Sequence, residues 1–137
     1  MAAKSRLERI ELRNDDVLIE ALFSGEESRA LGADLRTLIE QADTMIRIVV
    51  ALRQMSAGRR GNLDNSDAYR AVVELMSLRK RVNGVFDAVI RNWPGSHDEL
   101  ASALSVSSAE ARNRMSEVVR RPASLDEMWA LLSPLEY

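Results

Sequence analysis

The fold is decided by residues 24–56, SGEESRALGADLRTLIEQADTMIRIVVALRQMS. Its apolar residues recur at alternating spacings of four and three, which places them on one side of an α-helix. These residues are Leu31, Leu35, Leu38, Ala42, Met45, Val49 and Leu52. Ser24 and Glu27 form a capping box at the start, and Gly58 with Gly61 can end the helix in the left-handed conformation. We therefore predict a long amphipathic helix over about residues 25–56.

A second stretch, residues 66–93, repeats the pattern as SDAYRAVVELMSLRKRVNGVFDAVIRNW. Its apolar stripe is interrupted only by Arg79, and Pro94 ends it because the residue before a proline is disfavoured in a helix. Two long helices joined by a short polar loop fold back on each other. The sequence thus predicts a long antiparallel helical hairpin. The side chains expected to be buried between its helices are Leu38, Met45, Leu75 and Phe86.

Residues before the hairpin are apolar at irregular intervals and predict one or two short N-terminal helices, separated near Asn14. The predicted fold class is therefore all-α. We expect two domains, a helical bundle or oligomerisation module over 1–93 and a C-terminal unit with a final short helix over 94–137. The apolar stripes are wider than a two-helix contact needs, so we predict a homodimer formed mainly by the long helices.

The amino-acid composition excludes several classes of functional site. The 137 residues include no cysteine and a single histidine, His97, so neither a thiolate metal site nor a site of several imidazoles is available. We find no glycine-rich phosphate loop and no Ser-His-Asp arrangement, and we predict a non-enzyme without metal or cofactor. The sequence shows no signal-peptide pattern and no apolar run near the ~20 residues that cross a bilayer. We therefore expect a cytoplasmic protein that does not bind membranes.

From Ser96 the pattern changes to short helices with tight turns. Further Ser-x-x-Glu capping boxes begin at Ser96, Ser107 and Ser124. Residues 97–118, HDELASALSVSSAEARNRMSEV, resemble the helix-turn-helix of bacterial transcription regulators, including sigma-factor-like versions. In that resemblance Ala101 is the small residue of the first helix, and Ser105 takes the turn position that is usually glycine. The motif's small core would be Leu100, Leu104, Val106, Ala111 and Met115.

The resemblance implies that the helix from Ser108 enters the major groove of DNA. Residues near base edges would be Ser108, Ala109, Arg112 and Asn113, and phosphate contacts would come from Ser107, Arg114, Arg120 and Arg121. The charge of this segment is balanced, because its arginines are offset by Asp98, Glu99, Glu110 and Glu117. The net charge of the whole chain is −2. DNA-binding surfaces normally carry a basic excess.

Two interpretations remain open at the level of sequence. The first is a small DNA-binding transcriptional regulator, with the C-terminal helix-turn-helix as reader and the long helices as a dimerisation module. Its partners would be DNA and a second copy of the chain. The second is a non-catalytic helical adaptor that binds another protein through the hairpin, with the C-terminal helices only completing the fold.

Overall fold

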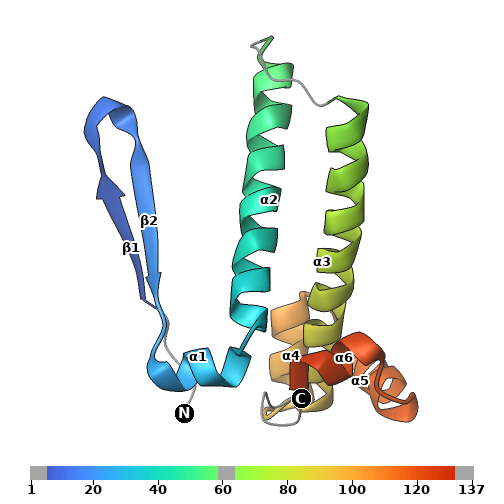
Figure 1. Cartoon of the computed structure of the whole chain (residues 1–137). Helices are drawn as coiled ribbons and strands as arrows, with labels where there is room; N and C mark the ends of the chain where they lie inside the picture. The colour runs from blue at the N-terminus through green and yellow to red at the C-terminus, as the bar shows by residue number, and fades with distance from the viewer. Residues whose placement is uncertain (1–5, 59–63, 132–137) are drawn as a thin grey trace. The chain divides into compact units, whose positions relative to one another are not determined.

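The computed structural model describes residues 6–58 and 64–131 and is mostly helical (Figure 1). In chain order its elements are β1 (Arg6–Glu11), β2 (Val17–Leu22), α1 (Gly25–Leu31), α2 (Asp34–Ser56), α3 (Asn65–Arg91), α4 (His97–Leu104), α5 (Ser108–Arg120) and α6 (Leu125–Leu131). The chain divides into two compact units between Glu40 and Gln41. The boundary expected between residues 93 and 94 falls inside the second unit, because α3 packs against α5 and α6.

The N-terminal segment is a two-stranded antiparallel sheet, so the prediction of short N-terminal helices is wrong. Strands β1 and β2 pair from Arg6 opposite Leu22 to Glu11 opposite Val17. Asn14 and Asp15 reverse the chain with φ angles of 63° and 62°, in the left-handed region that these two residue types tolerate best after glycine. The turn brings two six-residue segments together, and each of them is too short to form a stable helix by itself.

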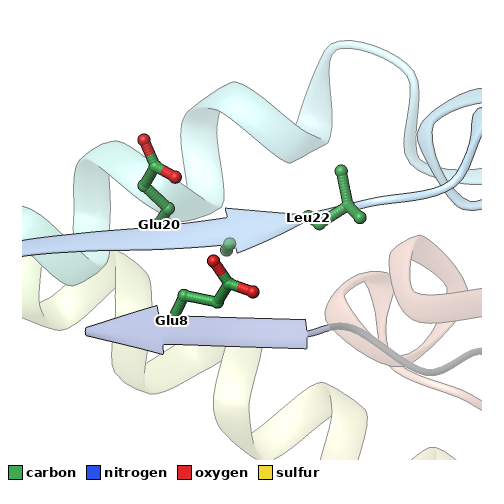
Figure 2. A pocket seen from close by; sticks show the side chains of 4 residues that line it. Glu8, Glu20 and Leu22 are labelled. Carbon is green, nitrogen blue, oxygen red and sulfur yellow. The ribbon is translucent and has the colours of Figure 1, made fainter. Parts of the chain in front are cut away.

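Acidic and apolar side chains share a hollow on this sheet. Glu8 and Glu20 are directly paired on β1 and β2, and they line the hollow together with Ala21 and Leu22 (Figure 2).

The helix predicted over 25–56 is interrupted at Gly32. The capping box at its start is confirmed, since Ser24 Oγ accepts from the Glu27 amide at 3.1 Å and Glu27 Oε1 accepts from the Ser24 amide at 3.3 Å. Gly32 adopts a φ of 54° and ends α1, and α2 begins two residues later. Gly58, with a φ of 70°, follows the end of α2 as expected, whereas Gly61 lies outside the described residues.

Helix α3 begins and ends close to the predicted bounds, but its buried side differs from the predicted one. The residues that α3 buries are mostly small, namely Ala71, Gly84, Ala88 and Ile90. Helices α2 and α3 run in opposite directions (Figure 1), and the Gln41 side chain bonds Ser77 at 3.4 Å and Arg81 at 3.2 Å. Gly84 is covered by the backbone of Asp126 at the start of α6, an approach that a larger side chain at this position would not allow.

The larger apolar residues of the two long helices are exposed in the single chain. Met45 and Phe86 are both 45% exposed, so the prediction that they are buried in the hairpin is wrong. On α2 the exposed set is Ile39, Met45, Ile46, Val49, Val50, Leu52 and Met55, and on α3 it is Val72, Val73, Met76, Val82, Val85, Phe86 and Val89. We call these two sets the apolar helix faces. Burying one such side chain is worth about 1.5–3 kcal/mol, so the faces favour association.

Candidate nucleic-acid interface

Helices α4 and α5 are joined by the three-residue turn Ser105–Val106–Ser107. Ser105, at the turn position that is usually glycine, has φ 56° and ψ 44°, in the left-handed region. The amide of Val106 donates to the carbonyl of Ala101 at 3.0 Å and closes the end of α4. A residue other than glycine adopts this conformation at some cost, so the surrounding packing must hold it.

The packing is supplied by the core that the sequence predicts for this segment. Leu100, Ala101 and Ala111 are at most 5% exposed, and Leu104, Val106 and Met115 pack around them half-buried. Ile90, Trp93 and Val118 complete the cluster. Alanine at positions 101 and 111 leaves room for α4 and α5 to approach closely. Helices α4 and α5 thus share one hydrophobic core with the end of α3.

Serine caps begin all three C-terminal helices. The hydroxyls of Ser96, Ser107 and Ser124 accept from the amides of Glu99, Glu110 and Glu127, each at 3.1 Å. Each of these bonds satisfies an amide that the helix itself leaves without a partner. The predicted starts of α4, α5 and α6 are therefore confirmed. Ser107, expected to contact phosphate, has its hydroxyl engaged in the cap.

Two ion pairs hold α6 and the C-terminal end of α5 against α3. The guanidinium of Arg91 donates to both carboxylate oxygens of Glu127, which is fully buried, and its Nη2 also donates to the Arg121 carbonyl at 3.0 Å. Arg121 in turn donates to Asp87 Oδ2 at 2.6 Å. Arg121, a predicted phosphate contact, is thus held against α3. The role of Arg91 has no local signal in the sequence, because its partner lies 36 residues away.

Hydrogen bonds from Arg91 lower the pKa of Glu127, against the opposing effect of burial, and the carboxylate raises the pKa of Arg91. A carboxyl group with a depressed pKa in the folded state stabilises that state above its unfolded pKa. The contribution disappears as the pH falls through the folded value. The Arg91–Glu127 pair is therefore a source of stability that acid removes.

Glu127→Gln is expected to lower the midpoint of thermal unfolding at pH 7, because the neutral amide leaves Arg91 without its counter-charge. The difference from wild type should shrink as the pH falls from the ordinary pKa of glutamate towards the lower pKa of the folded carboxyl, where wild-type Glu127 is protonated too. Thermal melts followed by circular dichroism at pH 7, 5 and 3 would measure this. Glu40→Gln is the matched control, since Glu40 forms a solvent-exposed ion pair with Arg36. A Glu127→Gln difference that stays constant with pH would contradict the account.

The predicted site residues of α5 fall into two groups. Ser108, Arg114 and Arg121 are engaged within the protein, with Ser108 donating to Asp98 and Arg114 pairing with Glu110 at 3.1 Å. The second group is exposed and follows one side of the helix at spacings of three and four. It contains Ala109, Arg112, Asn113 and Arg120 from the prediction, and also Ser116. We call these five residues the α5 outer stripe.

Charge is segregated around α5 rather than balanced locally. Glu110, Arg114 and Glu117 follow each other at spacings of four and three, on a stripe beside the outer one. The outer stripe itself contains two arginines and no acidic residue. The overall neutrality of this segment therefore coexists with one basic side on α5.

A hollow opens beside the outer stripe. It is lined by His97, Arg112, Met115, Ser116, Val119 and Arg120. His97 stands in the first turn of α4, and the other five come from α5. The sequence gives no local signal that His97 lies beside Arg112 and Arg120, because that proximity is produced by the turn between α4 and α5.

The described residues contain neither a cluster of metal ligands nor a helix that could cross a membrane. In the described ranges 6–58 and 64–131, no three His, Cys, Asp or Glu side chains gather as a metal site would require. Within the same ranges, every helix is too short or too polar to cross a bilayer. Comparison of the chain with protein-family models, curated proteins and solved structures gave no match.

Proposed function

We propose that this protein is a small DNA-binding transcriptional regulator in which α4 and α5 act as a helix-turn-helix. The observation that carries the proposal is the α5 outer stripe, which exposes Arg112, Asn113 and Arg120 on a helix whose other side is fixed in the core. A rigidly held helix with exposed polar and basic side chains is what major-groove readout requires. The stripe carries two arginines and is bordered by Glu117, which lies four residues after Asn113.

Asn113 is the residue we assign to base reading. Its side chain is exposed, and asparagine can form two hydrogen bonds with adenine in the major groove. Ala109 lies one turn before it on the same stripe and is small enough to contact a thymine methyl group. The arginines flank this pair and suit the DNA backbone.

Dimerisation completes the proposal. A single neutral reader gains little from counterion release, whereas two readers on two half-sites combine their affinities. The apolar helix faces supply a surface for the second copy. The apolar helix faces lie on α2 and α3, and the proposed DNA reader is α5. One chain can therefore use the faces for dimerisation and α5 for DNA.

A second candidate function is a helical adaptor for another protein. The same apolar helix faces favour it, since a groove between two helices can receive an amphipathic helix of a partner. The two candidate functions differ in the role of α5. An adaptor needs no exposed asparagine and arginines on that helix, so changing the outer stripe would leave its activity intact.

Asn113→Ala is expected to cost about 1–3 kcal/mol of discrimination at one A·T pair of the recognised sequence, because the variant loses both hydrogen bonds to adenine. The measurement is fluorescence anisotropy with a duplex enriched from genomic fragments and with its single-base variants. Arg114→Ala is the control on the same helix, since Arg114 pairs with Glu110 off the outer stripe. Equal base preferences for wild type and Asn113→Ala would count against α5 as the reader.

A further inference from the structure

The hollow beside the outer stripe collects hydrogen-bond donors. Arg112, Ser116 and Arg120 follow each other at intervals of four residues and therefore share one side of α5. His97 joins them from the first turn of α4, and Met115 and Val119 contribute apolar surface. Guanidinium groups can only donate, while a hydroxyl and an imidazole can each donate one hydrogen bond.

The side chains that line the hollow carry no negative charge, and two carboxylates close to them in sequence are hydrogen-bonded to residues outside it. Asp98, next to His97 in sequence, accepts a hydrogen bond from Ser108, and Glu110 pairs with Arg114. None of the described residues that line the hollow is acidic. Two arginines on one hollow repel each other until an anion lies between them, and the apolar side strengthens that attraction by reducing the local dielectric.

We propose that this hollow binds a phosphate group, with Arg112 and Arg120 as the charged contacts and His97 and Ser116 as additional donors. Arginine's planar fork matches the tetrahedral oxygens of phosphate and can donate two bonds at once. The site thus gives His97 a binding role. It also assigns Arg112 to phosphate rather than to the base edge that the helix-turn-helix resemblance suggested.

This phosphate site adds a backbone contact to the proposed function. It rests on the proposed function only in taking DNA as the source of the phosphate. Duplex DNA presents phosphates on both sides of the major groove that α5 would enter. A clamp at Arg112 and Arg120 would fix α5 along the backbone, while Asn113, one position further around the helix, reads the base. Phosphate contacts position a protein on DNA, and base contacts give the specificity. A small phosphorylated molecule is the other source of the same group.

The direct test uses inorganic phosphate and the full chain. His97 is the single histidine in the sequence, so its ring signals in a nuclear magnetic resonance spectrum are unambiguous. We expect them to shift saturably as phosphate is added at constant pH and ionic strength. Arg112→Gln and Arg120→Gln should each weaken the apparent affinity by about tenfold or more, as loss of a charged hydrogen bond requires. Arg47→Gln, which removes an exposed arginine of α2 that does not line the hollow, should behave as wild type.

A second arm with duplex DNA identifies the source. DNA that shifts the same ring signals and competes with phosphate supports a backbone clamp, and Arg120→Gln should then reduce the salt slope of DNA affinity by about 0.9. A response to phosphate without a response to DNA supports the site, assigns it to a small phosphorylated molecule and counts against the proposed function.

Two outcomes would overturn the clamp. The first is the absence of any response to either phosphate or DNA. The second is DNA binding that leaves the His97 signals and the two arginine variants unaffected, and this outcome would leave the proposed function standing. Arg112 and Arg120 are exposed, so their variants should fold as wild type does, which circular dichroism checks.

Discussion

Gly84→Ala is expected to destabilise the second unit, which begins at Gln41, by about 1–3 kcal/mol, the usual cost of forcing an extra carbon into a packed contact. Gly84 is buried in the middle of α3, and a Cβ there would overlap the backbone carbonyl of Asp126 at the start of α6. Backbone cannot move aside as the end of a flexible side chain can. The expected direction is opposite to the general rule, since alanine in a helix is otherwise better than glycine by about 1 kcal/mol.

Urea denaturation followed by circular dichroism would measure the Gly84 effect. Asn83→Ala is the matched control, because Asn83 is the preceding residue of the same helix and is exposed. It should be neutral or slightly stabilising, by about 0.5 kcal/mol at most. A Gly84→Ala variant as stable as wild type would show that α6 does not pack on α3 as described.

The double variant Ile46→Glu/Val49→Glu is expected to convert a dimer into a monomer. Both side chains belong to the apolar helix face of α2, where they are 57% and 39% exposed in the single chain. Each isoleucine or valine contributes about 1.5–3 kcal/mol when buried, and a carboxylate in its place adds a desolvation cost. With two changes in each of two copies, the dissociation constant should rise by at least about a hundredfold.

Light scattering at micromolar concentration is the measurement for this prediction. The wild type should have twice the chain mass of 15.3 kDa, and the double variant should have that mass. Gln54→Glu is the control, because Gln54 lies seven residues after Arg47 on the charged side of α2. Dimers that persist in the double variant would remove α2 from the interface. A monomeric wild type would refute dimerisation itself and leave the apolar helix faces to a different partner.

Features governed by neighbouring residues could be predicted from the sequence. The serine caps at Ser24, Ser96, Ser107 and Ser124 depend only on the next three residues, and all four are present. The left-handed Ser105 was predictable for the same reason, since the end of α4 demands it. Within the candidate site, these caps and the small core of α4 and α5 were the predictable part.

Features that depend on distant partners could not be predicted. Periodicity shows which residues of α3 share a side, but not which side meets its neighbours, so the burial of Gly84 and Ala88 and the exposure of Phe86 were missed. The N-terminal strands were missed because their identity depends on the turn at Asn14 and on pairing between segments. The Arg91–Glu127 pair joins residues 36 positions apart, and only the folded chain reveals it.

The central claim, that α4 and α5 form a DNA reader, is tested most directly by titrating the wild-type chain against a pool of genomic duplexes at about 50 mM salt, where electrostatic binding is strongest. The account predicts saturable binding that weakens as salt is raised, and a higher affinity for some duplexes of the pool than for the others. Absence of binding at this low salt would contradict it and leave the protein-binding adaptor as the better explanation of the apolar helix faces.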